Sequence, residues 1–134
     1  MYEYNAIITN VIDGDTFDLT VDLGFDVHKN MRVRLLEVDT PEKRGKEEKE
    51  LGKICTEYAI NHFLGEDVVI KSVKDKDAKS DSFGRYLVYC TLSDGTMIHE
   101  KYNSLGINKL FTETYSEDNV LKLEEELRGA DFLR

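Results

Sequence analysis

The chain has 134 residues, of which 40% are apolar and 34% are charged, with one proline and nine glycines. This composition is typical of one compact domain and excludes a fibrous repeat or a disordered chain. The formal net charge of −9 excludes a protein that wraps nucleic acid with a uniformly basic surface, although a local basic cleft is compatible with it. We therefore expect a single domain over residues 1–134, with a monomer as its state in solution.

The cysteines and the first residues indicate a reducing compartment. Cys55 and Cys90 lie far apart within apolar patterns, which favours two buried thiols over a disulfide or a metal pair. The first five residues lack the positive start and apolar core of a signal peptide, and no stretch reaches membrane-spanning length. The sequence predicts a cytoplasmic protein without a membrane partner, or a secreted one if a leader was removed.

Alternating apolar residues predict strands at the start of the chain. Between Tyr4 and Leu23 apolar side chains mostly alternate with polar ones, as in a strand with one face in water. The Asp-Gly-Asp sequence at residues 13–15 predicts a hairpin turn, because Asp-Gly readily adopts the positive φ angles of tight turns. Two consecutive antiparallel strands follow from this pattern.

A third strand is predicted after a second turn near Gly24. Residues 31–36 alternate again, and Arg32 and Arg34 occupy the face opposite the apolar side chains. The strand ends before Pro41, which cannot donate to a strand ladder. The first three strands therefore form a meander.

The middle of the chain predicts one helix and two more strands. Residues 46–64 carry apolar side chains at three-to-four spacing and end at Gly65, which is typical of an amphipathic helix. Residues 67–73 and 86–92 are strand candidates, and the polar residues 74–84 between them predict a surface loop.

Two more helices are predicted after the fifth strand. Residues 97–105 have a helical pattern that ends at Gly106, and a capping box precedes a helix over residues 114–127. Five strands, with one helix after the third and two after the fifth, predict an α+β, mainly β fold. We interpret it as a five-stranded OB-type Greek-key barrel with about three helices.

Two predicted loops present oxygen ligands. Asp13 and Asp15 lie at the first turn, whereas Asp39, Thr40 and Glu42 follow the third strand. Carboxylates and backbone carbonyls are the ligands of calcium or magnesium, and the scattered histidines and cysteines lack the spacing of a zinc site. The competing interpretation is ordinary turn chemistry, since the chain has 27 Asp and Glu residues.

Two arginines lie near these carboxylates in the sequence. Arg34 precedes Asp39 by five residues, and Arg85 stands at the entry to the fifth strand. Planar guanidinium groups bind phosphate oxygens in pairs and stay charged at any working pH. Each arginine alone is more often a surface charge, but the combination favours a phosphate-binding site.

Three short runs together resemble the motifs of the staphylococcal nuclease family. They are Val-Ile-Asp-Gly-Asp-Thr at residues 11–16, Arg-Val-Arg-Leu-Leu-Glu-Val-Asp-Thr-Pro-Glu at residues 32–42, and Phe-Gly-Arg at residues 83–85. They occur in the family's order and at similar spacing, and the resemblance extends from about Ile7 to about Leu110. The resemblance implies the OB-type barrel and a metal-dependent nuclease.

Carried over residue by residue, the resemblance implies a Ca²⁺ site. Asp15 and Asp39 would bind the ion through carboxylates and Thr40 through its backbone carbonyl, with Asp13 as a supporting carboxylate. The implied cofactor is Ca²⁺, and the implied partner is a nucleic acid substrate, either single-stranded or denatured DNA or RNA.

The resemblance also implies the catalytic residues. Glu42 matches the residue that orients or deprotonates the attacking water, while Arg34 and Arg85 match the pair that holds the scissile phosphate. The implied reaction is hydrolysis of a phosphodiester bond that leaves 3′-phosphate ends. Lys43 and Phe83, which flank these positions, are the candidate substrate-binding residues.

The chain departs from the family beside the active-site motifs. Ser82 and Phe83 stand where the family usually has a lysine and a tyrosine that contact a terminal phosphate, and residues 111–115 replace a tyrosine-bearing segment. With the acidic surface, these changes predict weaker substrate binding than in a basic relative.

Two alternatives remain open from the sequence. One is a non-catalytic module of the same fold that binds nucleic acid or protein, although such modules commonly lose the acidic or arginine positions that this chain keeps. The other is an acidic OB-type interaction domain, in which the carboxylates are turn residues and the arginines are surface charges.

Overall fold

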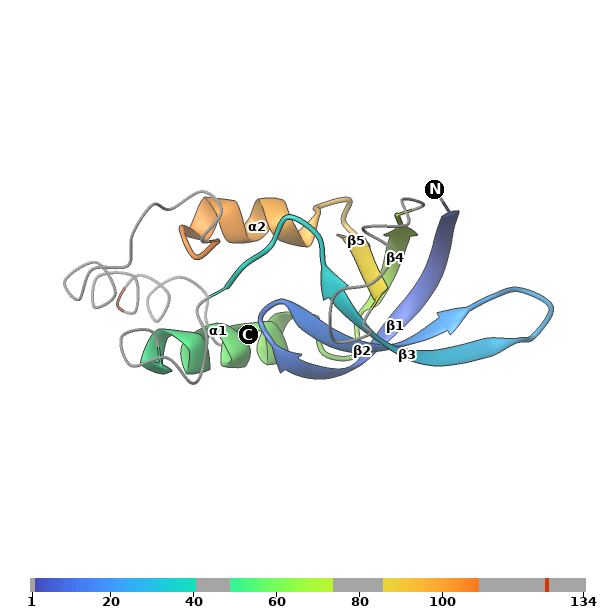
Figure 1. Cartoon of the computed structure of the whole chain (residues 1–134), viewed down its shortest axis with the longest axis horizontal. Helices are drawn as coiled ribbons and strands as arrows, with labels where there is room; N and C mark the ends of the chain where they lie inside the picture. The colour runs from blue at the N-terminus through green and yellow to red at the C-terminus, as the bar shows by residue number, and fades with distance from the viewer. Residues whose placement is uncertain (1, 41–48, 74–85, 109–124, 126–134) are drawn as a thin grey trace.

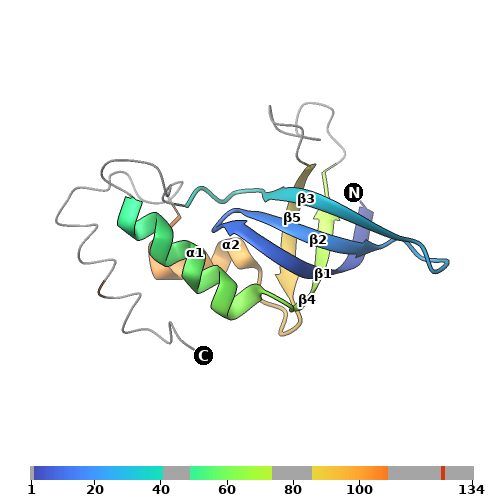
Figure 2. The same ribbon diagram turned by 90° about the horizontal axis from the view of Figure 1, so that it is seen from below.

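The computed structural model describes residues 2–40, 49–73, 86–108 and 125. In this part of the chain five strands close into a barrel in the order β1-β2-β3-β5-β4, and two helices pack at one end of it (Figure 1, Figure 2). The elements are β1 (Tyr2–Asp13), β2 (Thr16–Asp22), β3 (His28–Leu35), α1 (Lys49–Phe63), β4 (Asp67–Ser72), β5 (Tyr86–Leu92) and α2 (Ile98–Leu105).

The strand pairing confirms the predicted OB-type barrel. β1, β2 and β3 form an antiparallel meander, and β4 pairs antiparallel with both β1 and β5. The barrel closes through a short parallel pairing of β3 with β5, in which Arg34 stands opposite Leu87. This closure places β5 directly beside the arginine-bearing end of β3.

Most predicted element boundaries agree with the structure within a few residues. The first turn falls at residues 14–15, and α2 ends at Gly106, whose φ of 73° gives it the left-handed conformation of a helix C-cap. β3 begins earlier than predicted, at His28, because the polar residues before Met31 also pair with β2. The predicted loop over residues 74–84 and helix over residues 114–127 lie outside the described residues, apart from residue 125.

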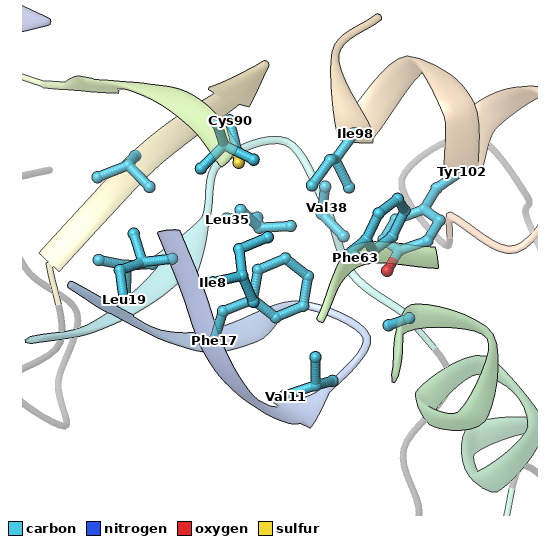
Figure 3. Packing of buried hydrophobic residues seen from close by; sticks show 14 of the residues in the cluster. Ile8, Val11, Phe17, Leu19, Leu35, Val38, Phe63, Cys90, Ile98 and Tyr102 are labelled. Atoms are coloured by element: carbon cyan, nitrogen blue, oxygen red, sulfur yellow. The ribbon is translucent and has the colours of Figure 1, made fainter. Parts of the chain in front are cut away.

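The core fills the barrel and continues under the two helices (Figure 3). Phe17 from β2 packs against Phe63 at the end of α1, with ring centroids 6.1 Å apart, and Phe63 contacts Tyr102 of α2 edge-on at 6.0 Å. Fully burying each of these side chains stabilises the fold by about 1.5–3 kcal/mol. The aromatic contacts fix both helices over one end of the barrel.

The two cysteines behave as the sequence predicts. Cys55 and Cys90 are both free and buried within the hydrophobic core. Burial raises the pKa of both thiols, that of Cys90 to about 12. No helix in the described part of the chain has the length and apolar character needed to cross a membrane.

Candidate nuclease site

The site begins at the tight turn between β1 and β2. The backbone N–H of Asp15 donates to Asp13 Oδ1 at 3.1 Å, which is the side-chain bond of an Asx turn. The carbonyl of Asp15 accepts a hydrogen bond from the N–H of Leu35 at 2.9 Å. These bonds fix the acidic turn against the end of β3, where the second predicted loop begins.

Gly14 is required by a close approach, not by its backbone angle. Its φ is not among the positive values in the described residues, so the expected reason for this glycine is wrong. A Cβ atom at Gly14 would lie 2.7 Å from Thr40 Oγ1 and 2.9 Å from Thr40 Cγ2. Glycine therefore allows the loop that carries Thr40 to pack directly on the turn.

Asp15 is the buried centre of the site. Its side chain is only 12% exposed. Thr16 Oγ1 donates to Asp15 Oδ1 at 3.1 Å, and the backbone N–H and hydroxyl of Thr40 each lie 3.4 Å from Oδ2. The carboxylate thus joins the first turn to the loop after β3.

Arg34 lies between the two predicted metal-binding aspartates. Its Nη1 donates to the carbonyls of Leu35 at 3.1 Å and Val38 at 2.7 Å. Its Nη2 lies 3.4 Å from Asp15 Oδ2 and 3.8 Å from Asp39 Oδ1. One nitrogen is therefore anchored to the backbone, and the other faces the carboxylates.

Asn108 is a site residue that sequence reasoning missed. It is fully buried, and its Oδ1 accepts a hydrogen bond from the backbone N–H of Asp39 at 3.0 Å. Its Nδ2 donates to the carbonyl of Glu37 at 2.7 Å and to Asn103 Oδ1 at 2.8 Å. Since Glu37 has a φ of 58°, Asn108 holds a strained turn directly before Asp39.

The electrostatics of the site favour a bound cation. Burial and the neighbouring Asp13 carboxylate raise the pKa of Asp15 to about 7, and the Arg34 guanidinium offsets this only in part. Among the described residues, the Arg34 guanidinium faces two carboxylates, those of Asp15 and Asp39, and Asp13 adds a third beside Asp15. An additional positive charge would therefore stabilise the ionised form of Asp15.

The donor set fits a hard divalent cation, although it is small. Within the described ranges no group of three or more His, Cys, Asp or Glu side chains is placed to hold a metal ion. Asp15 and Asp39 nevertheless converge on Arg34, and Thr40 lies against Asp15. Two carboxylates completed by a backbone carbonyl and water are compatible with the oxygen ligands that Ca²⁺ takes.

The structure brings together five of the nine residues predicted for the site. These five are Asp13, Asp15, Arg34, Asp39 and Thr40. The other four lie outside the described residues and stay predictions, namely Glu42, Lys43, Phe83 and Arg85.

Comparison with known proteins shows the family of the chain. The model of the family described as "Staphylococcal nuclease homologue" matches residues 32–130, a range that begins within β3 and covers more than half of the chain. The chain is also similar to Protein ParB of Escherichia coli, with 26% identity over 133 residues, which cover 95% of this chain and 70% of that protein.

Proposed function

The chain belongs to the family of staphylococcal nuclease homologues, and from that premise we propose that it is a calcium-dependent phosphodiesterase. The proposed substrate is DNA or RNA, in single-stranded or denatured form, and the proposed products carry 3′-phosphate ends. The observation that carries the proposal is the buried Asp15 carboxylate, which faces Arg34 at 3.4 Å and lies against the loop of Asp39 and Thr40. Ionising this buried carboxyl is costly because Arg34 offsets the effect of burial and of Asp13 only in part, and a bound cation would reduce that cost.

The proposed metal site consists of Asp15, Asp39 and the carbonyl of Thr40, with Asp13 supporting the turn. When bound there, Ca²⁺ would supply positive charge for the phosphate and hold it beside the attacking water. The raised pKa of Asp15 supports this assignment, because a carboxylate that lacks enough neighbouring positive charge gains the most from a cation.

Arg34 would bind a non-bridging oxygen of the scissile phosphate. Its Nη1 is held by two backbone carbonyls, so the guanidinium needs little reorganisation when a phosphate arrives. Hydrogen bonds from Arg34, and from Arg85 in its predicted role, would strengthen as negative charge builds on the equatorial oxygens. Binding that strengthens in the transition state raises kcat as well as affinity.

Glu42 is the proposed residue that orients the attacking water. An ordinary glutamate has a pKa near 4.3 and is a weak base at neutral pH, so holding the water in line contributes alongside proton removal. The predicted consequence is that Glu42→Gln loses turnover more than substrate binding.

The test is the release of acid-soluble nucleotides from heat-denatured DNA. We expect release with millimolar calcium, none with EGTA, and a loss of roughly 10²-fold or more in kcat for Glu42→Gln, on the scale of a general base. Asp39→Ala should abolish the stabilisation of the protein by calcium, since a ligand that binds only the native state raises its stability. Intact DNA in every reaction, with calcium still stabilising the wild type, would instead favour the non-catalytic module.

A further inference from the structure

The end of the barrel opposite the helices contains a cavity of about 520 Å³. Figures 1 and 2 show α1 and α2 together at one end of the strands, with the β2–β3 hairpin projecting at the other. Tyr4, Val21, Met31, Ile70 and Tyr86, one from each strand, are among the residues that line this cavity, which we term the barrel mouth. Its volume lies in the range of small-molecule sites, which often occupy the mouths of β-barrels.

Three tyrosines, Tyr2, Tyr4 and Tyr86, lie among the mostly aliphatic residues that line the barrel mouth. The rings of Tyr2 and Tyr4 stack with centroids 6.5 Å apart and planes at 29°. Tyr2 is 56% exposed and Tyr86 39% exposed, so water reaches both side chains. Exposed aromatic faces at the edge of a cavity are surfaces on which planar rings stack.

Lys29 gives the barrel mouth a positive charge. Lys29 lies four residues before the buried Val33 on β3 and therefore on the same, inward-facing side of the strand, and it lines the cavity together with Met31. Its Nζ lies 5.7 Å from the ring centroid of Tyr86, and no carboxylate among the described residues forms an ion pair with it. In a chain of net charge −9, a cation held among tyrosines favours a ligand that is both aromatic and anionic.

The wall of the barrel mouth includes the strand that pairs with the Arg34-bearing part of β3. Leu87, which lines the cavity, is the direct partner of Arg34 in the parallel pairing of β3 with β5. Adjacent strands lie about 4.8 Å apart, so the cavity wall begins one strand away from the arginine. The Arg34 side chain belongs to the face of β3 opposite Lys29 and Met31, so the barrel mouth is a binding site separate from Arg34.

We propose that the barrel mouth binds an unpaired base and an adjacent phosphate of single-stranded nucleic acid. The base stacks on the tyrosines, and the phosphate pairs with Lys29. Because a base enters the cavity only when it is unpaired, the site gives the protein a preference for single strands over duplexes. The identity of the ligand rests on the proposed function, whereas the cavity, its rings and its charge do not.

The direct test is methionine methyl NMR with a short oligothymidylate in EDTA, which prevents calcium-dependent cleavage. Met31 lines the barrel mouth and Met97 directly precedes α2, so the two methyl groups report on opposite ends of the barrel. We expect the Met31 resonance, assigned with Met31→Leu, to shift by ring current on binding while that of Met97 stays in place. A Met31 resonance that is unmoved when fluorescence anisotropy shows saturated binding, or the absence of binding, would overturn the proposal.

Charge and stacking are tested separately with matched variants. Lys29→Gln should reduce the slope of log affinity against log salt by about 0.7, the value for one phosphate on a single strand. Lys71→Gln removes the same charge from a lysine paired with Glu3 at 3.1 Å and should leave the slope unchanged. Tyr86→Ala should weaken binding roughly 5- to 100-fold, the range for one lost base stack. Equal effects of the two lysine variants would reject a specific role for Lys29.

The outcomes separate this site from the proposed function. Calcium-dependent cleavage of denatured DNA without a Met31 shift would reject the barrel mouth and retain the nuclease. A Met31 shift with no cleavage under any calcium concentration would retain the barrel mouth as a single-strand site and reject the nuclease. Tighter binding of duplex than of the single strand would also count against the barrel mouth.

Discussion

Replacing Asn108 by alanine tests whether this buried amide positions the loop of Asp39 that we propose to bind calcium. The substitution removes three hydrogen bonds, to the N–H of Asp39, the carbonyl of Glu37 and the side chain of Asn103. Each partner left unsatisfied in a partly buried place costs about 1 kcal/mol or more. We therefore expect Asn108→Ala to lower the free energy of unfolding by about 2–4 kcal/mol.

The loss of stability should be accompanied by a weaker calcium site. Without the bond to its N–H, Asp39 is no longer fixed relative to Asp15, and supporting contacts of this kind commonly change metal affinity by about 10- to 100-fold. Urea unfolding in EGTA measures the stability, and calorimetric titration at a temperature where the variant is folded measures calcium affinity. Faster hydrogen exchange at the amide of Asp39 would report the lost bond directly.

Asn103→Ala is the matched control for this experiment. It removes one of the three bonds of Asn108 but leaves those to Asp39 and Glu37 in place. We expect a loss of about 1 kcal/mol in stability and unchanged calcium affinity. The reasoning is refuted if Asn108→Ala is destabilised as expected but binds calcium like the wild type, or if Asn103→Ala weakens calcium binding equally.

Three further predictions follow from the same contacts. Gly14→Ala should lower the free energy of unfolding by about 1–3 kcal/mol and weaken calcium binding, because its Cβ would lie 2.7 Å from Thr40 Oγ1. In a double-mutant cycle, adding Thr40→Ala should restore part of both losses. With a pKa raised to about 7, Asp15 stays protonated in the folded protein while it ionises in the unfolded chain, so stability in EGTA should fall between about pH 4 and pH 7 by up to ~4 kcal/mol. Urea unfolding of Asp15→Asn should show a flatter pH profile, and an unchanged slope would contradict the assignment. Cys55 and Cys90 should resist a thiol reagent at pH 8 until the protein unfolds, and fast labelling of the native protein would show that the core is open.

The strands were predictable from sequence because their signals are local. Alternation of apolar residues identifies five strands, and the Asp-Gly turn separates the first two. The closure of β3 on β5 has no such local signal, since it pairs residues 33–35 with residues 86–88 across more than fifty positions. The order of the elements and the resemblance to a known family both predicted an OB-type barrel, but neither specified which residues of the two strands pair. The early start of β3 has no signal in the sequence, because its first three residues, from His28, are all polar and show no apolar alternation.

The candidate site was predictable where its residues stand in short motifs. Asp13, Asp15, Arg34, Asp39 and Thr40 were all identified in this way, and they lie together in the structure. What sequence reasoning lacked was any reason why the two loops meet. That reason depends on contacts between distant positions, which periodicity and turn propensity do not report.

Gly14 and Asn108 show this limit most clearly. The Asp-Gly pair predicts a glycine with positive φ, whereas the structure requires a glycine there because Thr40, 26 positions later, packs on it. A single asparagine after a helix gives no signal of its own, yet the bonds of Asn108 span 69 and 71 positions to reach Asp39 and Glu37. The one available hint is the position of Asn108 next to the apolar Ile107, which favours burial of both side chains.

The position of Asn108 ties the loop of Asp39, the proposed metal-binding loop, to the packing of α2. Glu37 holds a left-handed backbone that costs a non-glycine residue about 1 kcal/mol or more, and it persists only while its surroundings hold it. Asn108 stabilises this conformation through its hydrogen bond to the carbonyl of Glu37. Asn108 follows shortly after α2, whose Ile98 and Tyr102 are fully buried. The turn before Asp39 is therefore stable only when α2 is docked on the barrel. Conversely, a cation bound at the proposed site of Asp39 and Asp15 would stabilise the docked helix, because a ligand that binds only the ordered loop favours the contacts that order it. The candidate site and the end of the barrel closed by the helices thus form one cooperative unit, whereas the barrel mouth at the other end lies outside it.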